Sequence, residues 1–127
     1  MPSVHDNKIL SYSVDLQNDE LTIHTQSNSI AADKIDIIFT GVFNHFFEQP
    51  LKGSIILAIT ESPIEHFIQE NEELLNRNKG YCWPMVFDSA EQIETVLIEG
   101  AYKYITLLSS YGLNGWVLAR DVEIIAV

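Results

Sequence analysis

The chain has 127 residues, of which 46% are apolar, and its 18 acidic and seven basic residues give a formal net charge of −11. This acidity excludes nucleic acid and anionic membranes as partners, because phosphate binding requires a basic surface. It favours a basic protein partner, since complementary charge speeds association. The simpler alternative is that the acidity only keeps a small protein soluble.

The size and apolar content predict a single domain over residues 1–127, since one core commonly serves about 100–150 residues. No apolar run approaches the ~20 residues that cross a bilayer, and the N-terminus lacks the basic and apolar segments of a signal peptide. The one cysteine, Cys82, leaves no internal disulfide and suits a reducing compartment. We therefore expect a cytoplasmic protein.

The first third of the sequence has the alternation of β-strands. Apolar and polar residues alternate over 8–16 and 21–26, on either side of a polar turn, and this pattern predicts a β-hairpin. Residues 35–40 alternate in the same way. Residues 55–59 form a continuous apolar run, which is typical of a strand buried on both faces. The aromatic segment 41–47 between these two strands is interpreted as a connection packed on the core.

Two amphipathic helices are predicted next. Ser62 to Glu65 has the order of a capping box, and apolar residues then follow at helical spacing until the chain reaches Arg77 to Gly80. A second capping pattern begins at Asp88 and precedes a second apolar stripe. The connector from Tyr81 to Phe87 is aromatic and is interpreted as packed, with a short strand at its end.

The last third predicts a second hairpin. Strands are expected at 104–109 and 116–119 around a turn with Gly112 and Gly115, and 121–127 extends or bends the last strand. The predicted fold is α+β: a mostly antiparallel sheet of about six strands with two helices, in the order β-β-β-β-α-α-β-β.

The polar face of the first helix is the candidate partner-binding surface. Two aromatic residues flanking the hairpin tip are expected to be partly exposed anchors, because aromatic side chains bury a large area at low entropic cost. A solvated helix face and ordinary core packing are the alternatives. His66 and Glu70 share a helix face, but two ligands make a weak metal site. The candidate residues are Glu65, Glu70, Glu72, Glu73, Tyr111 and Trp116.

No catalytic group, metal site or cofactor site is predicted. Cys82 lies among aromatic residues with no cation nearby, so we expect a packed neutral thiol. His45 lies among phenylalanines with Glu48 close in sequence. A structural, hydrogen-bonded histidine is the simpler interpretation. A pocket near His45 and Glu48 would instead indicate small-ligand binding or enzymatic activity.

Three segments, FTGVFNHFFE, GSIILAITE and LLSSYGLNGWVLA, resemble a pattern in small acidic bacterial proteins. Some proteins of that kind are encoded beside polymorphic toxins and serve as immunity proteins. The resemblance covers most of the chain but rests on glycines and apolar residues, so no functional residue is carried over. It implies a stoichiometric inhibitor that covers a basic toxin domain, typically a nuclease.

The sequence therefore predicts a non-enzymatic, protein-binding domain whose acidic surface covers a basic partner. The alternative is a small-ligand-binding or enzymatic domain with a pocket near His45 and Glu48. Homodimer formation through an exposed sheet edge is compatible with either function.

Overall fold

The computed structural model of the protein describes residues 3–127, which form an α+β fold with one antiparallel sheet. Eight strands and three α-helices lie in that range. They are β1 (Lys8–Asp15), β2 (Glu20–Gln26), β3 (Lys34–Thr40), β4 (Asn44–Glu48), β5 (Ile55–Ser62), α1 (Ile64–Glu70), α2 (Glu72–Asn78), α3 (Ala90–Glu99), β6 (Lys103–Tyr111), β7 (Asn114–Ala119) and β8 (Asp121–Ala126), with a 3-10 turn, η1, at Lys79–Tyr81. The predicted fold class is confirmed, whereas the predicted numbers of strands and helices and their order are wrong.

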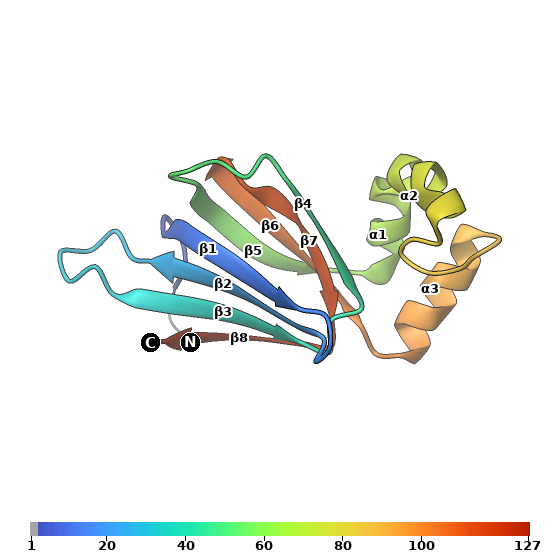
Figure 1. The fold of residues 1–127 in the computed structure, drawn as a ribbon, viewed down its shortest axis with the longest axis horizontal. Helices are drawn as coiled ribbons and strands as arrows, with labels where there is room; N and C mark the ends of the chain where they lie inside the picture. The colour runs from blue at the N-terminus through green and yellow to red at the C-terminus, as the bar shows by residue number, and fades with distance from the viewer. Residues whose placement is uncertain (1–2) are drawn as a thin grey trace.

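The eight strands follow the order β4-β7-β6-β5-β1-β2-β3-β8, and the sheet bends back on itself. Figure 1 shows two layers, β1-β2-β3-β8 and β5-β6-β7-β4. On one side the layers meet where β1 pairs with β5 at Lys8 and Ile55 alone. On the other side two chain segments turn the corner, one at Gly41 with a φ of 60° and one at Arg120, whose backbone N–H donates to Thr40 and Gly41. The bend creates an enclosed space between the layers.

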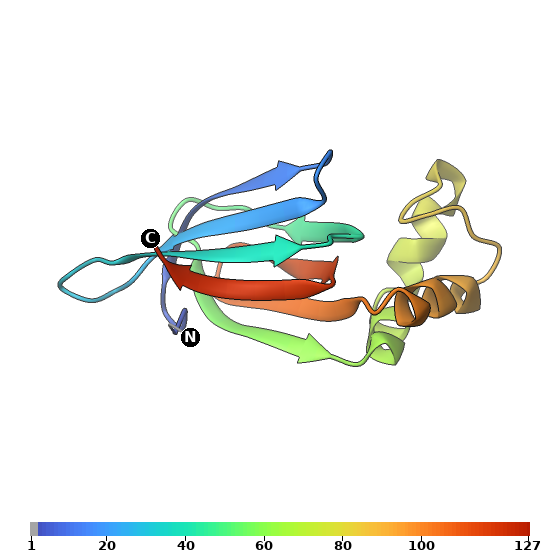
Figure 2. The same ribbon diagram turned by 90° about the horizontal axis from the view of Figure 1, so that it is seen from below.

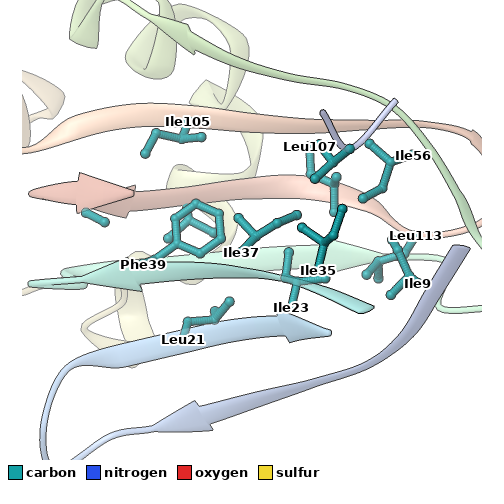
Figure 3. Close-up of a cluster of buried hydrophobic side chains, with 13 residues drawn as sticks. Ile9, Leu21, Ile23, Ile35, Ile37, Phe39, Ile56, Ile105, Leu107 and Leu113 are labelled. Atoms are coloured by element: carbon teal, nitrogen blue, oxygen red, sulfur yellow. The ribbon is translucent and has the colours of Figure 1, made fainter. Parts of the chain in front are cut away.

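An aliphatic core fills this space. The inward residues of β2 and β3 alternate with partly buried ones, so the predicted period of two is confirmed for both strands. Figure 3 shows their side chains lying beside those of Ile56 from β5 and Ile105 and Leu107 from β6. We call this cluster the sheet core; its buried members are Val4, Ile9, Leu21, Ile23, Ile35, Ile37, Phe39, Ile56, Ile105, Leu107, Leu113, Val117 and Ala119.

A second, aromatic-rich core joins the helices to the sheet. The three helices gather at one end of the molecule (Figures 1 and 2). Strand β7 is buried throughout its second half: Val117 and Ala119 belong to the sheet core, while Trp116 and Leu118 face the helices. We call this cluster the helical core; its buried members are Ile64, Phe67, Leu75, Phe87, Ile93, Leu97, Tyr104, Trp116 and Leu118.

Two strands differ from the sequence prediction. The aromatic segment expected to be a packed connection contains β4, which pairs with β7 from Asn44–Leu118 to Glu48–Asn114. Aromatic residues on both faces of β4 hide the alternation, because each face packs against a different cluster. Likewise β8 is a separate strand, since the turn at Arg120 moves it to the other layer, where it pairs with β3.

The exposure of two other strands also corrects the prediction. In β5 only Ile56 is fully buried, and Leu57 is 41% exposed. One edge of β5 pairs with β6. The other edge pairs with β1 at Lys8 and Ile55 alone and otherwise bonds to the chain before β1, through His5, Asp6 and Asn7. The continuous apolar run therefore does not indicate burial on both faces here.

The first predicted helix is in fact two short helices, α1 and α2, which meet at Asn71. The backbone at this residue has φ −119° and ψ 16°, outside the helical range. Its side-chain Nδ2 donates to the carbonyl of Phe67, and its Oδ1 accepts from the indole of Trp116. Asparagine side chains compete with helical backbone in this way, so the packing of one buried tryptophan interrupts the helix.

Neither predicted capping box forms. Ser62 is the last residue of β5, and Pro63 precedes α1 without a side-chain cap. Ser89, not Asp88, is the N-cap of α3, and it too makes no side-chain bond. The short strand expected near Phe87 is absent, because residues 82–89, between η1 and α3, form a loop. Ser62 does not cap α1 because it belongs to β5, which pairs with β6 up to that residue.

Candidate functional site

A cavity of about 460 Å³ opens between β4, the α1–α2 junction and the start of β7. We call it the acidic cavity. The close approach of β4 to β7 shapes it: a side chain at Gly115 would collide with the backbone of Phe46, so glycine is required there. The lining residues are Phe46, Glu48, Glu70, Asn71, Glu73, Leu74, Arg77, Asn114, Gly115 and Trp116.

A chain of hydrogen bonds fixes the base of the acidic cavity. The Trp116 indole N–H donates to Asn71 Oδ1 at 3.0 Å. Asn71 Nδ2 lies 3.4 Å from the Tyr104 hydroxyl, which in turn donates to Glu70 Oε2 at 2.6 Å. Strands β6 and β7 therefore hold the end of α1 through a network of four side chains, each of which has a partner.

This network keeps Tyr104 neutral and orients the carboxylate of Glu70. Burial of Tyr104, followed by its hydrogen bond to Glu70, raises the pKa of the phenol well above its usual value. Tyr104 is therefore a neutral donor at physiological pH, and its hydroxyl orients one oxygen of the Glu70 carboxylate. The other oxygen of that carboxylate accepts no side-chain hydrogen bond within residues 3–127.

The negative charge around the cavity lacks ion-pair partners. Nine of the 18 acidic residues lie between residues 61 and 99, the segment with all three helices, against two of the seven basic residues. Within residues 3–127, the ion pairs closer than 4.0 Å are His5–Asp6 and His24–Asp36, so no lysine or arginine neutralises a glutamate. Arg77 lines the acidic cavity but makes no such pair. The site can therefore accept a cation.

Three of the predicted site residues come together here. Glu70, Glu73 and Trp116 line the acidic cavity. Glu72 adjoins it, in a shallow hollow of about 480 Å³ that Glu70 and Glu73 also line. We call Glu70, Glu72 and Glu73 the acidic face.

Three predicted site residues differ from the prediction in exposure or in position. Trp116 is only 4% exposed, so the prediction of a partly exposed anchor is wrong for it; its N–H donates to the partly buried Asn71 Oδ1 instead. Tyr111 is 52% exposed, as predicted, but it lies opposite Ile55 and is not part of the acidic cavity. Glu65 is exposed in the first turn of α1 and lines neither hollow.

His45 and Glu48 do not share a pocket. Three positions apart on β4, they point to opposite faces of the strand. Glu48 lines the acidic cavity, whereas His45 lies beside Phe47, with ring centroids 5.5 Å apart. Burial lowers the pKa of His45, which favours the neutral imidazole. Of the two residues named for the alternative pocket, Glu48 therefore lines the acidic cavity and His45 does not.

Two residues of the network were missed from the sequence, although one left a signal. Asn71 occupies a position in the apolar stripe predicted for the first helix. A polar residue on a core-facing stripe requires a buried hydrogen-bond partner, and that requirement indicates a network. Tyr104 gave no comparable signal, since tyrosine is common in strands.

The structure also describes the other features considered from the sequence: a metal site, Cys82 and a membrane span. Residues 3–127 contain no group of three or more histidine, cysteine, aspartate or glutamate side chains placed to hold a metal ion. Cys82 is exposed and has a φ of 57°, so the expectation of a packed thiol is wrong. In the same range, every helix is too short or too polar to span a bilayer.

The site is thus a cavity with a hydrogen-bonded base, lined by glutamates that have no ion-pair partner within residues 3–127. In comparisons with known proteins, no protein-family model matches the chain, and no curated protein matches its sequence.

Proposed function

We propose that the protein is a non-enzymatic protein-binding domain whose acidic face and acidic cavity bind a basic protein partner. One observation supports this most strongly: Glu70 and Glu73 line a cavity with a hydrogen-bonded base, Glu72 lies in the hollow beside it, and none of the three forms an ion pair within residues 3–127. A partner that brings lysine or arginine supplies the missing counter-charge.

The cavity favours arginine over lysine as the entering side chain. The planar guanidinium binds carboxylates in a bidentate manner, and Glu70 and Glu73 present carboxylates at the rim of one cavity. Phe46 also lines it, and arginine stacks on aromatic side chains. The network that holds Glu70 and Asn71 fixes this surface before binding, so little ordering is required.

The finer proposal is that the partner is a basic toxin domain of the nuclease type and that the protein is its immunity protein. The sequence resemblance and the net charge of −11 support it. An inhibitor of this kind needs a rigid acidic surface rather than a catalytic group, and it acts in the cytoplasm, where such a nuclease would act.

The test is capture of partners from a lysate of the source cell, at about 50 and about 500 mM NaCl, since salt screens exposed charges. Each captured protein is purified and its Kd is measured against the wild type and two double variants. Glu72→Lys with Glu73→Lys reverses the acidic face without touching the Tyr104 bond. Glu91→Lys with Glu94→Lys on α3 makes the same charge change elsewhere in the helices.

We expect a basic partner that is released at high salt and that binds the α2 variant at least about tenfold more weakly. The α3 variant, with equal net charge, should lose much less. Equal losses in both variants would show that only net charge matters, and the acidic face would then not be the binding site. Capture of no partner at either salt concentration would contradict the proposed function.

The alternative is a small ligand in the acidic cavity. Its volume lies within the range of small-molecule sites, and Glu48, one of the two residues on which that alternative rested, lines it. In that case cationic small molecules such as arginine methyl ester should shift the amide resonances of Asn71 and Gly115. Such binding should persist when no protein is captured.

A further inference from the structure

The edge of β1 is unpaired over most of its length. From Ser11 to Asp15 the strand pairs with β2 on one side, but on the other side its pairing with β5 ends at Lys8. Within residues 3–127 no further strand covers this edge. An unpaired edge presents a row of backbone donors and acceptors to any extended chain.

The inward face of β1 is apolar and uncovered. A β-bulge at Leu10 shifts the register, so that Ile9 and Tyr12 both face inward, opposite Thr25 and Ile23. Beyond the bulge the other layer covers little of β1. Tyr12 packs edge-on against Phe47 but is still 39% exposed. The predicted apolar alternation in β1 is therefore real, yet it does not lead to burial; the exposed members are Leu10, Tyr12, Val14 and Leu16.

The edge of β1 lacks the charged residues that protect the edge of β8, the last strand of the same layer. β8 carries Asp121 and Glu123 as exposed charged residues. Charged side chains on an edge oppose pairing with other chains. Between Lys8 and Asp15, β1 carries no charged residue at all. Of these two edges, β1 is the one open to strand addition.

A groove of about 550 Å³ runs along this edge. It lies between β1 and the loop at 50–54, with Ile9 and Leu113 at its buried side. We call it the β1 groove. Its charged lining residues are Lys8 and Lys52, with no acid, although the whole chain is strongly acidic. Neither lysine forms an ion pair within residues 3–127. The lining residues are Lys8, Ile9, Leu10, Ser11, Tyr12, Pro50, Leu51, Lys52, Gly53, Ser54 and Leu113.

We propose that the β1 groove binds an extended, apolar peptide segment bearing a carboxylate, which pairs with β1 as an added strand while the carboxylate contacts Lys8 and Lys52. The backbone of β1 supplies the hydrogen bonds, and alternate side chains of the segment cover Tyr12 and Val14. This is the mode of strand addition to an open sheet edge. The site is separate from the acidic face and opposite in charge, so it does not rest on the proposed function.

A peptide fits this surface better than the other occupants. A small amphiphilic carboxylate could use the lysines and Leu113 but not the free backbone edge from Leu10 to Asp15. A second copy of the chain could pair through β1, but it would bring a charge of −11 rather than a local complement to the two lysines. Only an acidic, extended peptide uses the edge, the apolar face and both lysines.

The test titrates the full chain with an acetylated hexapeptide of alternating valine and threonine that ends in glutamate with a free carboxylate. Amide resonances and hydrogen exchange are recorded for Leu10–Asp15. A peptide with alternate N-methylated amides lacks the donors for pairing and serves as the backbone control. Decanoate serves as the amphiphile control.

Two charge variants complete the design. Lys8→Glu with Lys52→Glu reverses the groove, and Lys34→Glu with Lys103→Glu makes the same change at lysines outside it. We expect peptide binding to slow exchange along β1, to be at least about fivefold weaker in the groove variant than in the control variant, and to disappear on N-methylation.

Three results would overturn the proposal. The first is no resonance shift at about 2 mM peptide. The second is equal binding of decanoate or of the N-methylated peptide, which would assign the groove to an amphiphile. The third is slow exchange along β1 without peptide, together with dimers in sedimentation, which would assign the edge to a second copy of the chain.

Discussion

The sheet core and the helical core are stabilised in different ways. The sheet core is almost entirely aliphatic, with Phe39 as its single aromatic member, and its side chains have no polar atoms to satisfy. The helical core contains Phe67, Phe87, Tyr104 and Trp116. The last two carry an O–H and an N–H that must be paired when buried. Asn71 and Glu70 pair with them.

This difference explains where the candidate site lies. An aliphatic cluster needs only a matching strand period, and none of its own side chains requires a hydrogen-bond partner. An aromatic cluster with polar atoms requires hydrogen-bond partners, and here those partners lie at the α1–α2 junction, next to the acidic face. The need to satisfy Trp116 thus both interrupts the helix and builds the base of the acidic cavity.

The largest expected effect is from truncation in the sheet core. Phe39 is 1% exposed, and Phe39→Ala should lower the free energy of unfolding by about 3–5 kcal/mol, through lost burial and the cavity left behind. Urea denaturation followed by circular dichroism measures the change. Phe39→Leu, which retains most of the volume, is the control. Equal losses in the two variants would show that cavity formation is not the cause.

The next effect tests the polar requirement of the helical core. Trp116→Phe keeps a ring in place but leaves Asn71 Oδ1 without its donor, and this should cost about 1–3 kcal/mol. Adding Asn71→Leu removes the unpaired acceptor, so the double variant should be more stable than the sum of the two single changes. Strict additivity in this double-mutant cycle would show that the bond does not couple the two residues.

A smaller effect should appear at alkaline pH. Tyr104 has a raised pKa in the folded state, so its contribution to stability is complete below its ordinary pKa of about 10 and is lost as pH rises beyond that value. Tyr104→Phe should therefore show a shallower decline of unfolding free energy between about pH 9 and 11. Tyr81→Phe, at an exposed position, should decline like the wild type; a matching decline in Tyr104→Phe would contradict the assignment.

The smallest effect concerns His45, at the margin between the two layers. Burial lowers its pKa in the folded state. Its contribution to stability is therefore present above its ordinary pKa of about 6.5 and is lost as pH falls below that value. His45→Gln should reduce the fall in stability between about pH 7.5 and 5. His66→Gln on α1 is the control, and an equal reduction in both variants would remove His45 as the cause.

The sequence determined the elements with a clear period. The alternation in β2 and β3 predicts a strand, and the apolar stripe of α3 predicts a helix. Each pattern is clear because the element buries a single face. The α+β class followed from hairpins that do not alternate with helices. The glutamates of the acidic face were also visible as a polar helix face, since surface charge depends little on distant contacts.

Only the tertiary structure decided the features that depend on residues far apart in the chain. β4 is a strand because β7 pairs with it, and Asn71 ends a helix because Trp116, 45 positions later, needs an acceptor. The same holds for β1, whose apolar residues remain exposed because the opposite layer does not reach over them. A local pattern shows which residues prefer burial, but whether a partner covers them depends on packing between distant segments.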